Sequence, residues 1–175
     1  MKHYDFKVFV CFGILAIFLF IRCSNNKFTE AEKTEIFKLI KLSIDEGVRA
    51  TQNKDINLYM KNIPKDLLIY DETGTTITRK QQREYALRDW SIIDKTLSIE
   101  VKIDSIDFVS KDSIHVYTSQ RWERIMFQRD GVATDTVLTT QKHKEIWKPT
   151  SRAWLGYTVE ELGGQIFVNG ETYNQ

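Results

Sequence analysis

Two long strands joined by one tight turn are predicted by residues 113–148, which read SIHVYTSQRWERIMFQRDGVATDTVLTTQKHKEIWK. Threonine, valine, isoleucine and aromatic residues recur through this stretch, and such residues favour strands. Asp130-Gly131 at its centre is a strong hairpin signal. If Arg129 pairs with Val132 across that turn, the register of the whole hairpin follows by counting. The other elements are predicted outward from this hairpin.

Further strands flank the hairpin on both sides. In residues 97–108 every second residue is apolar, first at the odd positions 97–103 and then at the even positions 106 and 108. This change from odd to even positions predicts a bulge or bend in the strand. After the hairpin, a turn at 149–152 leads into a strand at 153–162. Gly163-Gly164 then breaks or bulges the chain before residues 165–168. The second half of the chain is therefore predicted to be a meander of antiparallel strands.

Three helices are predicted ahead of these strands. Thr29-Glu30-Ala31-Glu32 is a capping-box pattern that opens a helix running to about Ala50. Asp55 can cap a short second helix, and residues 66–71 read as a short strand. Thr78-Arg79-Lys80-Gln81 is a second capping box that opens the third helix. This order predicts an α+β fold with the helices on one face of a curved antiparallel sheet.

Two spaced motifs accompany this order of elements. They are Ala50-x4-Asp55-x3-Tyr59 at the helix pair and Leu68-x2-Asp71-x2-Gly74 before the third helix, and Trp147 and Trp154 flank a turn between long strands. Over roughly residues 29–170 the pattern resembles the cone-shaped domain of the nuclear transport factor 2 (NTF2)-like superfamily, which includes SnoaL-like polyketide cyclases and many small exported bacterial proteins.

The resemblance implies an NTF2-like cone: three N-terminal helices packed on a curved antiparallel sheet, with a conical cavity between them. Related sheets pair face to face, so it also implies a homodimer as a candidate assembly. It implies no particular function, because members of the superfamily include enzymes, ligand binders and scaffolds.

An apolar segment precedes this domain. Val8 to Ile21 contains no charge, with Lys2 and Lys7 before it and Arg22 after it. The run is shorter than the ~20 residues of a usual spanning helix and matches the apolar region of a signal peptide. Three readings stay open: a lipoprotein signal with lipidation at Cys23, where Arg22 replaces the small residue of the usual pattern; an uncleaved anchor; or a cleaved signal. In each, we expect the domain to be exported and to lie on the periplasmic or extracytoplasmic side of a bacterial membrane.

The chain therefore divides into a signal peptide or membrane anchor at 1–23, a tether at 24–28 and one domain at 29–175. A net charge of +1 lacks the basic field that nucleic-acid binding normally needs, so nucleic acid is not expected as a partner. Both cysteines, Cys11 and Cys23, precede the domain, and the three histidines are scattered, so no metal site is predicted. No Gly-rich phosphate loop is present, and no cofactor is expected.

One face of the predicted sheet carries the candidate site. Counting from the turns gives the rows Thr118–His143–Thr158, Gln120–Gln141–Glu160 and Trp122–Thr139–Leu162 across three strands. A few convergent polar groups among aromatic ones are typical of a small-molecule site. The ligand-binding candidates are Tyr59, Thr118, Gln120, Trp122, Gln141 and Thr158.

The catalytic candidates on this face are His143, as a general base, and Glu160, as the carboxylate that orients it. A strand histidine beside Thr and Gln is more often a hydrogen-bonded structural residue, and tryptophans on such a face are more often core. We therefore favour a non-catalytic cell-envelope domain that binds a small apolar or amphipathic ligand or a partner protein. The alternatives are a cofactor-independent isomerase, dehydratase or cyclase using His143 and Glu160, and a mainly structural dimer.

Overall fold

The computed structural model describes residues 27–151 and 153–173. The predicted signal or anchor segment at 1–23, with Cys23, lies outside these residues, as does most of the predicted tether. Among the described residues no helix is long and apolar enough to cross a membrane.

Three helices and seven strands make up the described part of the chain. The helices are α2 (Glu30–Gln52), α3 (Ile56–Lys61) and α4 (Arg79–Ile92). The strands are β1 (Leu68–Tyr70), β2 (Thr76–Thr78), β3 (Ile93–Ser110), β4 (Ser113–Phe127), β5 (Thr134–Pro149), β6 (Trp154–Val168) and β7 (Glu171–Thr172). The short strands β2 and β7 were not predicted.

All three predicted helix starts are confirmed. The Thr29 hydroxyl accepts a hydrogen bond from the Glu32 amide at 3.2 Å, and the Glu32 carboxylate accepts from the Thr29 amide at 2.7 Å. Thr78 and Gln81 form the same reciprocal pair at the start of α4. One oxygen of Asp55 accepts from two backbone amides at the start of α3. These bonds satisfy amide donors that a first helical turn leaves unpaired.

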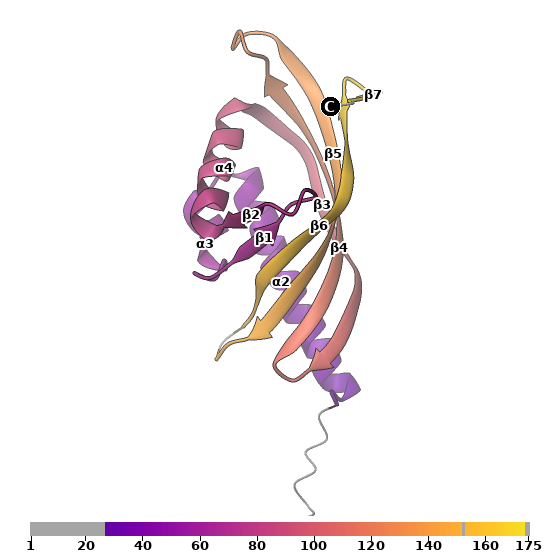
Figure 1. The fold of residues 1–175 in the computed structure, drawn as a ribbon. Coiled ribbons are helices and arrows are strands. Elements are labelled where there is room, and N and C mark those ends of the chain that lie inside the picture. The colour runs from indigo at the N-terminus through magenta and orange to yellow at the C-terminus, as the bar shows by residue number, and fades with distance from the viewer. Residues whose placement is uncertain (1–26, 152, 174–175) are drawn as a thin grey trace, which may run out of the picture.

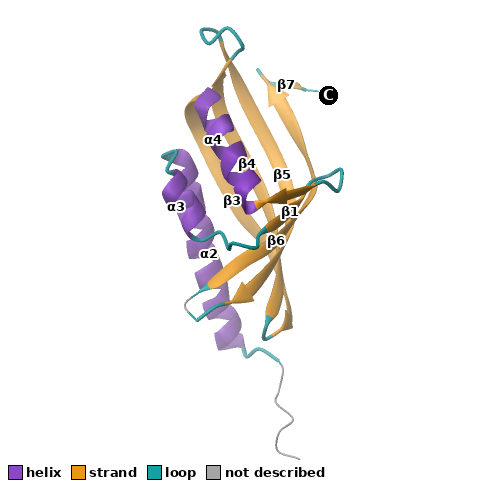
Figure 2. Cartoon of the chain, turned by 60° about the vertical axis from the view of Figure 1, so that its left-hand side comes forward, coloured by secondary structure: helices purple, strands orange, loops and turns teal. Residues whose placement is uncertain are grey.

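The strands form one curved sheet in the order β2-β1-β6-β5-β4-β3, with β7 at the far end of β6 (Figure 1). All pairs are antiparallel except β1 with β6, which run parallel, so the sheet is mixed rather than purely antiparallel. The helices lie on one side of this sheet, with α4 in front of the long strands (Figure 2). The predicted α+β cone is confirmed.

The best-packed part of the core lies where α2 meets the lower half of the long strands. Its buried residues are Ile36, Ile40, Ile114, Val116, Trp147 and Trp154. Phe28 closes the end of the cluster, with its ring centroid 5.1 Å from that of Phe108. Trp147 and Trp154 are therefore core residues, as expected from sequence. This cluster ties the first helix to the sheet and leaves the upper half of the concave face uncovered by it.

The predicted register of the central hairpin is confirmed. Thr118 lies opposite His143, Gln120 opposite Gln141, and Trp122 opposite Thr139. The strands stop earlier than expected, at Phe127 and Thr134, because the Asp130 carboxylate accepts hydrogen bonds from two amides within the loop. The loop is longer than a two-residue turn but keeps the same pairing.

The predicted register of the next strand is wrong. The Thr150 amide donates a hydrogen bond to the Ala153 carbonyl oxygen, and Trp154 pairs with Pro149, whereas Ala153 was expected opposite Lys148. Two further one-residue slips, between Ile146 and Trp147 and between Lys142 and His143 of β5, leave Tyr157 and Leu162 of β6 unpaired with β5. Each slip turns the side chains beyond it to the other face of the sheet.

The second bulge requires a close approach of backbones at Gly164. We expect Gly164→Ala to lower the free energy of unfolding by about 1–3 kcal/mol, because the added methyl group would overlap the carbonyl oxygen of Thr140. Gly47→Ala in α2 is the matched control: its methyl group would meet nothing within 4 Å, and the change should raise stability by about 0.5–1 kcal/mol. Urea unfolding of the purified protein measures both, and an unchanged Gly164→Ala midpoint would contradict this account of the bulge.

Candidate functional site

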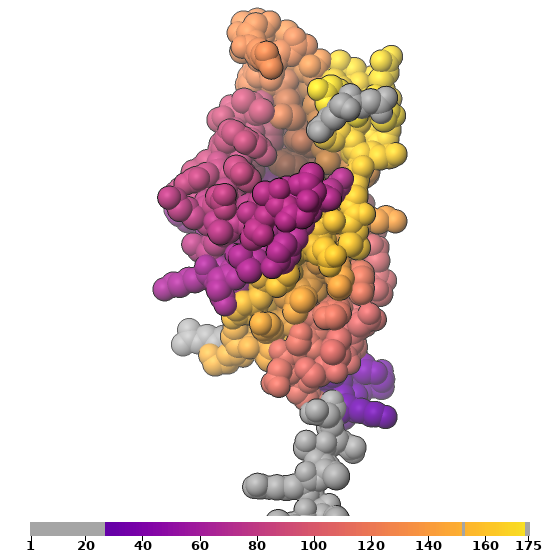
Figure 3. Space-filling view, in the orientation of Figure 1, coloured from indigo at the N-terminus to yellow at the C-terminus, as the bar shows by residue number. Residues whose placement is uncertain are grey.

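A cavity of about 530 Å³ lies between the concave face of the sheet and the helices. Its surface opening is visible as a hollow between α4 and strands β5 and β6, above the β1–β2 hairpin (Figure 3). Part of its lining is apolar or aromatic, with Ile99, Val101 and Trp90 among the contributors, and part is polar. The volume falls within the range of ordinary small-molecule sites.

Most of the residues predicted for the site do line this cavity. The sheet contributes Thr118, Gln120, Trp122, Gln141 and His143, and α3 contributes Tyr59. The two predicted residues on β6, Thr158 and Glu160, are not part of the lining. The structure therefore gathers the candidates from β4 and β5 and separates those from β6.

The exclusion of Glu160 corrects the predicted His143–Glu160 pair. Glu160 lies opposite Lys144, and the two side chains form an ion pair at 3.3 Å on the outer face of the sheet. Thr158 lies opposite Ile146 and shares that face. Between the two bulges of β6 the inward positions belong instead to Val159 and Glu161. The bulge at Tyr157 causes this exchange, because it shifts the alternation by one residue.

Glu145 is the cavity-lining carboxyl group that is bonded to the core residue Trp147. It lies beside Thr118 and Trp147, which are 1% and 5% exposed. One carboxyl oxygen accepts from the Thr118 hydroxyl at 3.0 Å and the other from the Trp147 indole N–H at 2.8 Å. Burial raises the pKa of Glu145 above its usual value, against the opposing effect of these two hydrogen bonds. The group is therefore a partly buried carboxyl that holds a proton to higher pH than an exposed one.

His143 is two residues from Glu145 on the same strand and faces the same cavity. Burial lowers the pKa of its imidazole, which favours the neutral form at physiological pH. A neutral imidazole has one nitrogen free to accept a proton. Its cross-strand neighbour on β6 is Glu161.

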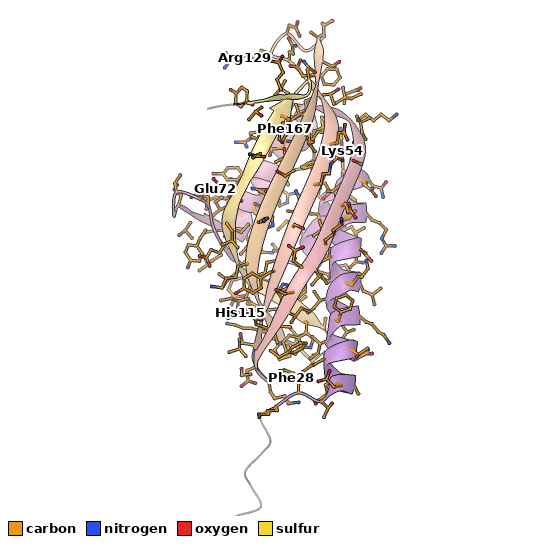
Figure 4. All side chains as sticks on the ribbon, turned by 90° about the vertical axis from the view of Figure 1, so that its right-hand side faces the viewer. Phe28, Lys54, Glu72, His115, Arg129 and Phe167 are labelled. Atoms are coloured by element: carbon orange, nitrogen blue, oxygen red, sulfur yellow. The ribbon has the colours of Figure 1, made fainter. Side chains whose placement is uncertain are left out.

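Glu161 lies at the rim of the cavity, near the β1–β2 loop from which Glu72 projects (Figure 4). Burial raises its pKa, and the nearby negative charges of Glu72 and Asp71 raise it further. A hydrogen bond from the Gln141 side chain acts in the opposite direction. Three carboxyl groups, those of Glu161, Glu72 and Asp71, therefore lie close together at this rim.

The helical wall adds an aromatic pair and two charged residues. Tyr59 and Trp90 pack edge to face with ring centroids 5.5 Å apart. The Tyr59 hydroxyl accepts a hydrogen bond from the Gln82 side-chain amide at 2.7 Å. Arg88 and Asp89 lie at the edge of the same wall and bond to each other at 2.9 Å.

Other sequence features have structural roles. Asp71 accepts hydrogen bonds from the backbone amides of Thr73 and Thr75 and so holds the β1–β2 turn. His115, near the lower end of the long strands (Figure 4), is three positions from Thr118, the residue opposite His143, and so lies on the other face of the sheet from the cavity lining. Within residues 27–151 and 153–173 no group of three or more His, Cys, Asp or Glu side chains is arranged to hold a metal ion.

Sequence reasoning missed Glu145, Arg124 and Glu161. The signal for Glu145 was available: it is two residues from both His143 and Trp147, so strand alternation places it on their face in any register. Alternation likewise places Arg124 on the face of Trp122, although a charged residue there would ordinarily be expected in solvent. Only the bulges of β6 bring Glu161 inward, and counting from the turn cannot locate them.

Solved structures with the same arrangement include enzymes and proteins of unassigned function. A hexachlorocyclohexane dehydrochlorinase superposes with a TM-score of 0.65 at 9% identity, covering 83% of this chain and 98% of that one. A ketosteroid isomerase-like protein from Erwinia carotovora atroseptica gives 0.56 at 12%, covering 78% and 99%. An NTF2-like protein from Cytophaga hutchinsonii gives 0.55 at 15%, covering 71% and 94%.

No protein-family model and no curated protein matches the sequence. At identities this low the structural likeness establishes the fold alone and carries no activity with it. The chain has the NTF2-like fold.

Proposed function

We propose that this domain binds a small amphipathic organic molecule in the cavity between its helices and its sheet. The observation that supports this most is a cavity of about 530 Å³ whose lining combines apolar and aromatic side chains with a few polar ones. Purely structural packing would fill such a space, because protein interiors are normally close-packed.

The polar lining favours an amphipathic molecule over a purely apolar one. Gln120 and Gln141 lie side by side in the middle of the sheet wall, with Trp122 one row away. Both side chains are half-buried, and although Gln141 bonds to Glu161, each amide has donors and an acceptor that a polar group of a ligand can use. The aromatic rings offer flat apolar surface for the remainder of the ligand.

Filling the cavity from α2 tests this proposal. Gly47 lines the cavity, and a side chain there would start in open space. We expect Gly47→Phe to weaken binding of the neutral two-ring probe 2-naphthamide by at least about tenfold, a loss of about 1.4 kcal/mol or more. Isothermal titration calorimetry measures the affinity, and circular dichroism checks the fold.

The matched control is Leu42→Phe, on the solvent side of the same helix and 65% exposed. It should leave the affinity within about twofold, since its side chain is not part of the cavity lining. No binding of the probe by the wild-type protein, or an equal loss in both variants, would contradict binding in this cavity.

A second candidate is proton-transfer catalysis of the isomerase or dehydratase kind. The observation that favours it is the pairing of two titratable groups in one cavity: burial favours the neutral form of His143 and keeps Glu145 protonated to higher pH. Such a pair can serve as a base and an acid, with His143 taking a proton from carbon and Glu145 donating a hydrogen bond to the developing oxyanion. Glu160 has no part in this version.

Deuterium exchange into 2-tetralone, a two-ring ketone with acidic C–H bonds, tests this candidate by NMR. We expect the wild-type protein to accelerate exchange, and His143→Gln or Glu145→Gln to reduce the acceleration by about 10²-fold or more. Glu160→Gln is the control and should have no effect, because that carboxylate is paired with Lys144 on the outer face. Absence of acceleration in the wild type, or an equal loss in Glu160→Gln, would contradict catalysis by this pair.

We also propose that residues 1–23 hold the domain on the extracytoplasmic side of a bacterial membrane. The support is the uncharged run from Val8 to Ile21 between basic residues. Phe28 lies at one tip of the described domain and Arg129 at the opposite tip (Figure 4). A tether attached at the Phe28 tip would leave the hairpin end accessible.

The mass of the intact protein extracted from membranes tests the tether. We expect either a lipid-modified chain that begins at Cys23 or an unmodified chain that retains Met1. A Cys23→Ser variant distinguishes the two, since only the lipidated form would lose its membrane association. A product that lacks residues 1–23, carries no lipid and is found free of the membrane would contradict tethering.

A further inference from the structure

The cavity end nearest the β4–β5 hairpin contains a positive charge that no described acidic side chain neutralises by direct contact. Arg124 stands on β4, with its guanidinium carbon 4.3 Å from the centre of the Trp122 ring. Its Nη1 donates to the Thr139 hydroxyl at 2.9 Å and contacts the Trp122 carbonyl oxygen at 3.4 Å. Stacking and hydrogen bonding thus fix the plane of the guanidinium group in the cavity wall.

Two hydrogen-bond donors at this end of the cavity lack a partner in the part of the chain that the structure describes. Arg124 Nε and Trp122 Nε1 are buried and have no hydrogen-bond partner within the described residues. The Arg124 hydrogen bonds in this part of the chain all come from Nη1, so Nη2 is also available. Native proteins leave few buried donors unpaired, and a cluster of them marks a place where an acceptor is missing.

The nearest acidic residue is already engaged. Asp89 attracts the Arg124 charge through space, but its carboxylate bonds to Arg88 at 2.9 Å. Burial lowers the pKa of Arg124, although an arginine side chain keeps its charge in proteins. A partly buried cation without a direct counter-ion favours the binding of an anion.

We propose that Arg124, stacked on Trp122, binds the carboxylate of an amphipathic organic acid whose apolar part lies against Ile99 and Val101. A planar guanidinium group matches a carboxylate through two parallel hydrogen bonds, which makes this anion the best geometric fit. The inference rests on the proposed ligand-binding function and narrows its ligand to one chemical class.

The opposite rim limits the ligand to one carboxylate. Glu161 faces the cavity there, with Glu72 and Asp71 close enough to raise its pKa. A second carboxylate on the ligand would meet these like charges and be repelled. The expected class is therefore the monocarboxylic acids with an apolar or aromatic body.

The test compares two probes of nearly the same size and shape, the anion 2-naphthoate and the neutral 2-naphthamide, by isothermal titration calorimetry on the wild-type protein. We expect naphthoate to bind at least about tenfold more tightly, the contribution of a hydrogen-bonded charge pair. Arg124→Met, which removes the guanidinium group but keeps an apolar side chain about as long as the methylene stem of arginine, should abolish that preference, chiefly by weakening naphthoate.

Arg121→Met is the matched control, because Arg121 is a second arginine of β4 that is not part of the cavity lining and pairs with Glu123 at 3.0 Å. It should retain the preference for naphthoate, since a charge in solvent contributes little. Equal binding of the two probes by the wild type would overturn the carboxylate site and leave ligand binding intact, whereas binding of neither would overturn both. If Arg124→Met weakens both probes equally, Arg124 only supports the wall and the inference fails.

Discussion

The pairing of β6 with β5 through two one-residue bulges is the constraint on which the cavity depends. A strand alternates its side chains between two faces, so each unpaired residue reverses the faces of the residues after it. Tyr157 and Leu162 are the two unpaired residues, and only the segment between them is reversed. That reversal places Glu161 in the cavity and sends Glu160 to the outer face, where Lys144 pairs with it. The close backbone approach at Gly164 shows why glycine is needed where the normal alternation resumes.

The free-energy cost of burying each polar group of the cavity wall is offset in a different way. Glu145 would be costly to bury alone, but Thr118 and Trp147 donate hydrogen bonds to both of its oxygens. His143 avoids the cost by favouring its neutral form. Arg124 stacks on Trp122 and donates hydrogen bonds from Nη1, but its Nε has no partner within the described residues, so the cost of burying its charge is only partly offset. The polar atoms around Glu145 are therefore hydrogen-bonded, whereas Arg124 Nε and Trp122 Nε1 near the β4–β5 hairpin have no partner in the described part of the chain.

The parts of the fold set by local chemistry could be predicted from sequence. Thr29 and Thr78 indicate helix starts through their capping boxes, and the β4–β5 register follows from the loop around Asp130. The change from odd to even apolar positions in β3 appears as a register slip between Ile103 and Ser105. The bulge at Tyr157 could not be predicted, because a single extra residue is placed by how the strand fits its neighbour and the core beneath. The charged side chain of Arg124 was missed for a related reason: its position inside depends on stacking with Trp122, which composition does not reveal.

The proposed binding site and the proposed catalytic pair share one cavity, because Arg124 at one end and His143 with Glu145 at the other all lie on the same sheet wall. His143 and Thr139, which bonds Arg124, are four residues apart on β5, a separation of about 13 Å along the strand. A carboxylate held at Arg124 would direct the apolar body of its ligand past Gln120 and Gln141 toward His143 and Glu145. Orientation of this kind is what a proton transfer requires, since a base acts only on a C–H bond held within its reach. The same anchor would therefore serve a binding protein for short acids and an enzyme for longer ones, and the length of the ligand beyond its carboxylate decides between the two roles.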